Sequence, residues 1–168
     1  MRLRRHCRIA LRAAAALVAV AWTALPRAAG AQQPRQGSEQ EVMRVITGLF
    51  DAMRARDTAK MRAAFDPDVK FTSVTMGRDS TSIQNEELDE FLRAVGTPRP
   101  DTLDERLRSP VVHVDGDLAT VWTEYDFFVG TRFSHCGADA FQLVRRKEGW
   151  RIVALADTRR RTGCPTSQ

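Results

Sequence analysis

The C-terminal half of this 168-residue chain alternates apolar and polar residues, and three turn signals divide it into segments. Asp115-Gly116 is a preferred sequence for a two-residue type I′ turn, and Gly130-Thr131 begins with the glycine that a type II′ turn favours. Glu148-Gly149 is the third signal. Because period-two alternation is typical of strands, this half predicts a four-stranded antiparallel meander. The predicted strands cover residues 109–114, 117–129, 132–147 and 150–160.

The residues before the meander follow a helical period instead. Ser38 and Glu41 have the spacing of a capping box at a helix start. Apolar residues then recur along one helical stripe, at Val42, Val45, Ile46, Leu49, Phe50 and Met53. A short second helix after Asp57, a strand at 69–71 and a third helix at 86–95 follow. The predicted fold class is α+β: N-terminal helices packed in a curved, mostly antiparallel sheet, which forms a cone-shaped α+β barrel.

Residues 1–31 have the composition of a cleavable signal peptide. A basic segment with five arginines precedes an apolar run at 13–25, which is too short to span a bilayer as a mature helix. Ala29-Gly30-Ala31 has the small-x-small pattern of a cleavage site. The alternative, an amphipathic cytoplasmic helix, would need polar residues that 13–21 lack.

We therefore expect cleavage near Ala31, through the Sec or the twin-arginine route, and a periplasmic or secreted product without a stable membrane anchor. A flexible leader at 32–37 would precede one domain at 38–164 and a tail at 165–168. The whole chain has 26 Lys and Arg against 21 Asp and Glu, but six of those arginines and no acid lie within 1–31. The mature chain, with 20 basic and 21 acidic residues, carries a net charge of −1, so nucleic acid is not an expected partner.

Counting back from the two later turns predicts which residues face each other across the sheet. Asp126 would face His135, and Trp122 would face Asp139. That sheet face would combine an apolar floor with a few polar groups, which is typical of a small-molecule site. Its candidate pocket residues are Trp122, Glu124, Asp139, Phe141, Leu143 and Thr158. The opposite face, with Tyr125, Phe127 and Asp157, is also largely apolar and would meet a partner or a helix.

The order of elements, helix–helix–strand–helix–meander over residues 39–164, resembles the nuclear transport factor 2-like superfamily. This superfamily includes SnoaL-like cyclases and ketosteroid isomerases. Segments of the meander resemble an exported branch of it: Tyr125-Asp126-Phe127, Phe133-Ser134-His135-Cys136-Gly137, Phe141-Gln142-Leu143-Val144, Trp150-x-Ile152 and Asp157-Thr158-Arg159-Arg160 with Cys164. The resemblance implies the cone fold but no single activity, because this fold carries isomerases, dehydratases, cyclases and binding modules.

His135 opposite Asp126 is a candidate general base, since a carboxylate orients an imidazole and raises its pKa toward working pH. The alternative is a surface ion pair with no catalytic role. Asp139 and Asp157 are either acid partners or counter-ions of nearby arginines. The isomerase tyrosine cannot be carried over, because Tyr125 is the only tyrosine and does not lie in the first helix. No phosphate loop, nucleophile elbow or metal-ligand spacing occurs, and no cofactor or metal is expected.

The sequence thus favours an exported domain that binds a small apolar molecule, with a possible homodimer through its sheet. Two alternatives stay open. One is a SnoaL- or isomerase-like acid–base enzyme that uses His135 with Asp126. The other is a non-catalytic structural or partner-binding protein with a filled core.

A disulfide between Cys136 and Cys164 is the remaining prediction. These are the only cysteines after the signal peptide, and disulfides persist outside the cytoplasm. The tail can turn back after Thr162-Gly163 and bring the two Cα atoms within bonding range.

Overall fold

The computed structural model describes residues 33–77 and 80–165. Three helices lie in the first half: α1 (Gln33–Ala55), α2 (Thr58–Ala64) and α3 (Leu88–Gly96). Six strands make one sheet: β1 (Phe65–Met76), β2 (Thr81–Glu86), β3 (Leu103–Asp115), β4 (Leu118–Val129), β5 (Arg132–Arg146) and β6 (Gly149–Arg159). This is the predicted α+β class, with helices followed by a mostly antiparallel curved sheet.

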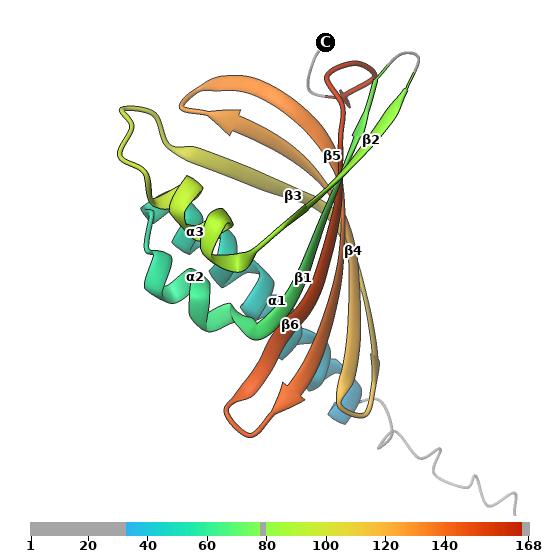
Figure 1. Ribbon diagram of the computed structural model, residues 1–168. Helices are drawn as coiled ribbons and strands as arrows, with labels where there is room; N and C mark the ends of the chain where they lie inside the picture. The colour runs from blue at the N-terminus through green and yellow to red at the C-terminus, as the bar shows by residue number, and fades with distance from the viewer. Residues whose placement is uncertain (1–32, 78–79, 166–168) are drawn as a thin grey trace, which may run out of the picture.

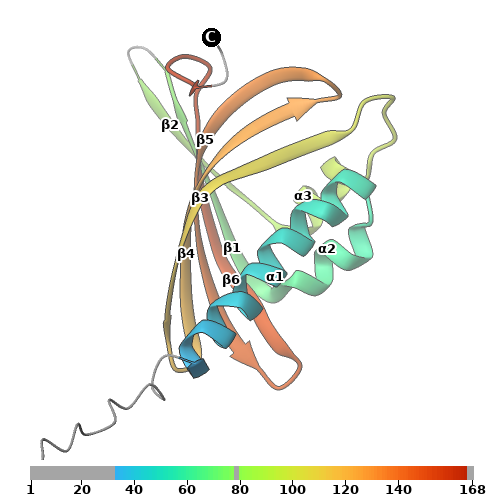
Figure 2. The ribbon, with the colours of Figure 1, turned by 180° about the vertical axis from the view of Figure 1, so that it is seen from behind.

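The sheet has the order β2-β1-β6-β5-β4-β3, and only the β1–β6 pair is parallel. Figure 1 shows a strongly curved sheet whose concave side holds all three helices. Seen from behind, α1 crosses the same concave side (Figure 2). Elements that are far apart in the sequence therefore enclose one interior between the helices and the sheet.

One hydrophobic core joins α1 to the sheet. The predicted stripe of α1 is buried here, with Val42 and Ile46 fully inaccessible. Phe50 on α1 meets Phe141 on β5 edge to face, with ring centroids 6.2 Å apart. The predicted second helix is also present, because Asp57 caps α2 by accepting the backbone N–H of Lys60 at 3.0 Å. This core lies toward one end of the sheet and leaves the other end to form a cavity.

Several predicted boundaries differ from the structure, including the start of β3, which begins at Leu103 and not at 109. Helix α1 begins at Gln33, so Ser38 lies inside the helix and the expected leader at 33–37 is helical. The predicted strand at 69–71 is the middle of a twelve-residue strand, and its hairpin partner β2 was missed. The signal peptide, its cleavage near Ala31 and residues 166–168 of the predicted tail lie outside the described residues.

The predicted pairing of Asp126 with His135 is wrong. A bulge at Ser134 shifts the β4–β5 register by one residue, so Asp126 pairs with Cys136 and His135 pairs with Phe127. Trp122 likewise pairs with Ala140 and not with Asp139. A one-residue shift moves side chains to the other sheet face, and turn counting cannot detect a bulge inside a strand.

The β5–β6 register also differs from the predicted one. The turn falls between Arg146 and Gly149, one residue earlier on β5 than predicted, and a second irregularity follows Gln142. Asp139 consequently faces Asp157, where the turn count predicts Thr158. The side chains of the later part of β6 therefore have the opposite orientation to the predicted one.

The predicted disulfide is confirmed. Cys136 and Cys164 are bonded, with their Cα atoms 5.8 Å apart. Cys136 pairs with Arg160 in an isolated bridge, and both cysteines are buried. The bond holds the C-terminal segment against the start of β5, on the side of the sheet that Asp126 faces.

Candidate functional site

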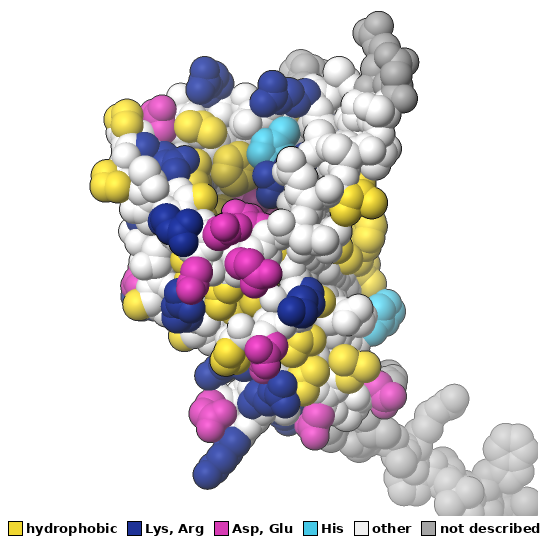
Figure 3. All heavy atoms as spheres, in the orientation of Figure 1, with side chains coloured by type: hydrophobic (Ala, Val, Ile, Leu, Met, Phe, Trp, Pro, Cys, Tyr) yellow, Lys and Arg dark blue, Asp and Glu magenta, His cyan; other side chains and the backbone are white. Residues whose placement is uncertain are grey.

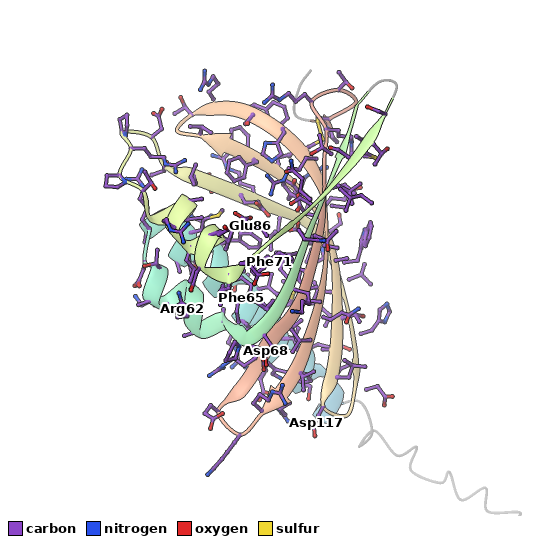
Figure 4. All side chains as sticks on the ribbon, in the orientation of Figure 1. Arg62, Phe65, Asp68, Phe71, Glu86 and Asp117 are labelled. Carbon is purple, nitrogen blue, oxygen red and sulfur yellow. A yellow bond between two sulfur atoms is a disulfide. The ribbon has the colours of Figure 1, made fainter. Side chains whose placement is uncertain are left out.

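A cavity of about 340 Å³ lies between the concave sheet face and helices α1 and α3. Figure 3 shows a hollow on this side of the molecule, with hydrophobic side chains inside and charged ones around it. Its lining comes from every strand and from two helices. Glu86 and Phe71 lie on the side of the sheet that faces α3, where they contribute to this lining (Figure 4).

Most of the cavity wall is apolar. Leu49, Phe50 and Met53 reach it from α1, because they belong to the buried stripe of that helix and form the part of the core that borders the cavity. The rings of Phe71 and Phe91 pack 5.3 Å apart on the opposite wall. Such a wall favours the hydrocarbon part of a small molecule.

Polar groups are concentrated along one row that crosses the sheet. The register places Ser73, Asp157 and Asp139 side by side on β1, β6 and β5. Ser73 donates to Asp157 at 2.5 Å, and the Arg159 Nε donates to the same carboxylate at 2.7 Å. Asp157 is thus fully engaged with the protein's own groups.

Asp139 has different surroundings. It is only 2 % exposed, and no N–H or O–H group of the described residues donates to its Oδ2 atom. Its hydrogen-bonding neighbour is the carboxyl group of Glu105, which reaches over from β3. Two carboxyl groups in contact can form a hydrogen bond only when a proton lies between them. The geometry therefore indicates a carboxyl pair that holds at least one proton.

Burial raises the pKa of both groups of this pair. The pKa of Asp139 is raised to about 7, mainly by burial; the hydrogen bond with Glu105 and the charge of Arg159 oppose this shift, and the charge of Asp157 supports it. Burial, followed by the charge of Asp139, raises the pKa of Glu105 well above its ordinary value. The pair therefore keeps a proton near neutral pH, so it can donate as well as accept one.

Tyr125 separates the carboxyl pair from the end of β6. Its hydroxyl donates to the Thr158 carbonyl oxygen at 2.8 Å and lies 3.5 Å from Asp157. Gly137, its partner on β5, leaves room for this ring, since a Cβ atom there would lie 2.7 Å from Tyr125 Cε1 and 1.7 Å from the Thr158 carbonyl. Burial and then the Glu105 charge raise the pKa of Tyr125, so the phenol stays neutral.

His135 lines the cavity beyond this tyrosine. Its ring stacks on Phe127, with centroids 4.8 Å apart, and its Nδ1 lies 3.1 Å from the Ser134 hydroxyl. Burial lowers the pKa of His135, and the charge of Arg159 adds to this effect. The imidazole is therefore neutral at pH 7 and able to accept a proton or a hydrogen bond.

Two further charged groups line the cavity near α3. Burial raises the pKa of Glu86, which is the last residue of β2. Arg99 donates from its Nη2 atom to the Ala94 carbonyl at 2.5 Å, so its charge neutralises the C-terminal end of α3. Apart from Arg99, the charged groups that line the cavity lie on the sheet.

Of the predicted pocket residues, Asp139 lines the cavity, as does the candidate base His135. Phe141 and Leu143 point to the same side but lie in the core beneath α1. Three residues do not reach the cavity because of the bulges: Trp122, Glu124 and Thr158. Trp122 is 54 % exposed on the outer sheet face, whereas His135 lies on the inner face.

Asp126 also lies on the outer face. It forms an ion pair with Arg108, whose Nε lies 3.1 Å from the Asp126 Oδ2, and it is 4 % exposed. The side chains of Asp126 and His135 therefore lie on opposite faces of the sheet, although the two residues are close together on the neighbouring strands β4 and β5. The sequence prediction of this dyad depended on the register that the Ser134 bulge changes.

Glu105 was missed as a site residue because the predicted strand began at 109 and excluded it. A signal was available, since Leu103, Glu105 and Leu107 alternate with charged residues as one strand face. Tyr125 and Asp157 were assigned to the face that would meet a partner or a helix, but the register shifts bring them to the same side as His135 and Asp139, where they line the cavity.

Within residues 33–77 and 80–165, none of the helices has the length and hydropathy of a membrane span. The same part of the chain contains no group of three or more His, Cys, Asp or Glu side chains arranged for a metal ion.

One protein family matches residues 37–156 of this chain, and its description reads "Putative lumazine-binding". No protein with a curated description matches the sequence. Solved structures of NTF2-like proteins share the fold at low identity. One from Novosphingobium aromaticivorans, with a cystatin-like fold, is 16 % identical over 82 % of this chain and 90 % of its own, with a TM-score of 0.63.

Two further structures of this fold are similar over most of the chain. An NTF2-like superfamily protein from Salmonella enterica is 15 % identical over 80 % of this chain and 99 % of its own, with a TM-score of 0.60. A "putative dehydratase" of the NTF2-like family from Streptomyces avermitilis is 17 % identical over 77 % and 99 %, with a TM-score of 0.59. At these identities the likeness shows the fold, and function depends on the site.

Proposed function

Because the chain belongs to the family described as "Putative lumazine-binding", within the nuclear transport factor 2-like superfamily, we propose that it is an exported domain that binds a small, largely apolar molecule. One observation carries this proposal: a cavity of about 340 Å³ has an apolar wall and, at one end, a carboxyl pair made of the buried Asp139 and the half-buried Glu105. A protein with a purely structural role would gain stability by filling this space.

Export is the second part of the proposal. The signal-peptide pattern of residues 1–31 supports it, and so does the Cys136–Cys164 disulfide, since such bonds persist in the periplasm and outside the cell. We propose cleavage near Ala31 and a periplasmic or secreted mature protein.

We also propose a homodimer through the outer sheet face. Val111 and Trp122 are cross-strand partners there and are 48 % and 54 % exposed. Two copies related by a two-fold axis would cover this apolar pair on both subunits.

Proton-transfer catalysis is a second candidate function at the same cavity. His135 is a neutral base, and the pKa of Asp139, about 7, suits a group that exchanges a proton near neutral pH. In this proposal Glu105 and Asp139, and not Asp126, are the carboxyl groups that act together with His135 in proton transfer.

Cavity occupancy can be tested with a variant that blocks the entrance. Ala94 lines the cavity from the exposed side of α3, so Ala94→Trp adds a ring there without overfilling the core. Arg93→Trp is the matched control, because Arg93 is exposed on the same helix and does not line the cavity. The readouts are fluorescence of the neutral probe N-phenyl-1-naphthylamine, and a titration with lumazine.

We expect the probe to bind the natural sequence and Arg93→Trp alike, and to lose at least about tenfold in affinity for Ala94→Trp. Equal binding by all three proteins, or by none, would contradict the proposed function. Native mass spectrometry of the protein from its own periplasm would then identify a co-purifying compound.

A further inference from the structure

The polar end of the cavity is acidic and short of hydrogen-bond donors. Asp139 and Glu105 face each other there, while Asp157 is already engaged by Ser73 and Arg159. The Oδ2 atom of Asp139 is buried and receives no donor from the described residues. A buried carboxylate oxygen without a donor is costly, so a molecule that brings a donor to it gains this interaction on binding.

We propose, on the basis of the proposed function above, that the cavity selects small apolar molecules that carry a basic amine, whose ammonium group takes the place of the proton between Glu105 and Asp139. The hydrocarbon part of the amine then lies against the aromatic wall. An ammonium has several N–H groups and can donate to both carboxylates at once, which a single hydroxyl cannot do.

The charges around the pair favour a cation over an anion. The titratable and charged groups that face Asp139 from the surrounding strands are Glu105, Tyr125, His135, Asp157 and Arg159, and Glu86 and Arg99 lie toward α3. The α1 residues at the cavity, Leu49, Phe50 and Met53, are uncharged. Arg159 is paired with Asp157, and Arg99 bonds the end of α3. An anionic ligand would therefore approach the carboxyl groups of Glu105 and Asp139. Both arginines that line the described cavity, Arg159 and Arg99, are already bound to other groups of the protein.

Aromatic rings beside the pair strengthen this preference. Tyr125 and Phe127 lie on β4 next to the strands that carry Asp139 and Glu105, and both line the cavity. The face of an aromatic ring attracts a cation, most strongly where water is excluded.

Proton release follows from the same geometry. The carboxyl pair holds a proton in the free protein, and an ammonium group that lies between the two carboxylates displaces it. Amine binding should therefore tighten as pH rises from about 5 to 8, because the competing proton leaves the pair over this range. Above the pKa of the amine itself, binding should weaken again.

Three probes of nearly equal size separate charge from shape: 1-naphthylmethylamine, 1-naphthalenemethanol and 1-naphthoate. Isothermal titration calorimetry at pH 7.5, in two buffers of different ionisation enthalpy, measures affinity and proton release together. We expect the amine to bind at least about tenfold more tightly than the alcohol, the naphthoate to bind most weakly, and amine binding alone to release protons.

Asp139→Asn is the informative variant, because it keeps the size of the side chain and removes its charge. We expect it to weaken amine binding at least about tenfold and to reduce proton release, while alcohol binding changes less than about threefold. Glu87→Gln is the matched control, since Glu87 is exposed near α3 and does not line the cavity. It should leave all three affinities unchanged.

The outcomes distinguish this inference from the proposed function. If the alcohol or the naphthoate binds as tightly as the amine, and Ala94→Trp blocks that binding, the cavity takes ligands but the amine preference is overturned. Retention of the amine preference in Asp139→Asn would also overturn it. If no probe binds, including N-phenyl-1-naphthylamine, both proposals fail.

Discussion

The two faces of the sheet each bury one carboxylate almost completely, and they treat it differently. On the outer face Asp126 is 4 % exposed and has the Arg108 guanidinium 3.1 Å away. On the inner face Asp139 is 2 % exposed, and its neighbour is the acid Glu105. The outer arrangement neutralises charge within the protein, whereas the inner one leaves charge to be neutralised by a proton or a ligand. The difference indicates that the inner face is arranged for binding at the expense of stability.

The largest expected effect concerns the disulfide, which lies beside Asp126 on the outer face. Replacing both cysteines, Cys136→Ala with Cys164→Ala, should lower the free energy of unfolding by about 3–4 kcal/mol, because the unfolded chain loses a 28-residue cross-link. Urea unfolding of both proteins measures this. An equal midpoint for the two would show that the outer face does not depend on the bond.

The outer ion pair should come next. Arg108→Met removes the cation beside Asp126 and should cost about 2–3 kcal/mol, below the value for a fully buried pair because Arg108 is partly exposed. Arg106→Met is the control on the same strand. Its partner Asp104 lies in a more exposed pair, so the cost should stay under about 1 kcal/mol. Similar losses in both variants would show that the Arg108–Asp126 pair contributes no more than an exposed pair on the same face.

The ionised carboxyl pair on the inner face should lower the free energy of unfolding, whereas the ion pair on the outer face raises it. The pKa of Asp139 is about 7 in the folded protein and near 3.8 in the unfolded chain, so the folded state binds more protons between these values. The free energy of unfolding should therefore fall, by about 1 kcal/mol for each pH unit, as pH rises from about 4 to 7. Asp139→Asn should lose the part of this decline that Asp139 contributes and be more stable than the natural sequence at pH 8.

Asp157→Asn provides the matched control for this variant on the same row of the sheet. Asp157 is hydrogen-bonded by Ser73 and Arg159, so its replacement should destabilise the protein at pH 8. If Asp139→Asn also destabilises the protein at pH 8, the inner carboxyl pair does not lower the stability of the folded state as we describe.

The smallest effect on unfolding is expected at Trp122. Trp122→Ser replaces an exposed side chain and should change monomer stability by less than about 0.5 kcal/mol. It should nevertheless shift a dimer toward monomer in sedimentation velocity experiments, because the indole would lie in the proposed interface. A natural sequence that is monomeric at all accessible concentrations would refute the dimer proposal.

Local sequence signals predicted the elements of the fold better than the composition of the site. The helical stripe ending at Met53, the cap at Asp57 and the turn at Gly130-Thr131 depend on nearby residues, and all three are present in the structure. The two other predicted turns are present but displaced by one residue, to 116–117 and 147–148. The disulfide followed from cysteine count and compartment. The site depends on which side chains share a face across four strands, and a single bulge at Ser134 reverses that assignment for β4. A bulge arises from tertiary packing, so turn counting could not have located it.

The central claim is that Glu105 and Asp139 hold a proton between them near neutral pH. Carbon-13 NMR of the side-chain carboxyl groups, followed from pH 4 to 9, tests this directly. We predict that Asp139 titrates with a midpoint near pH 7 and that Glu105 also titrates well above its ordinary range. If both Asp139 and Glu105 are fully ionised at pH 5, the carboxyl pair does not exist and the account is wrong.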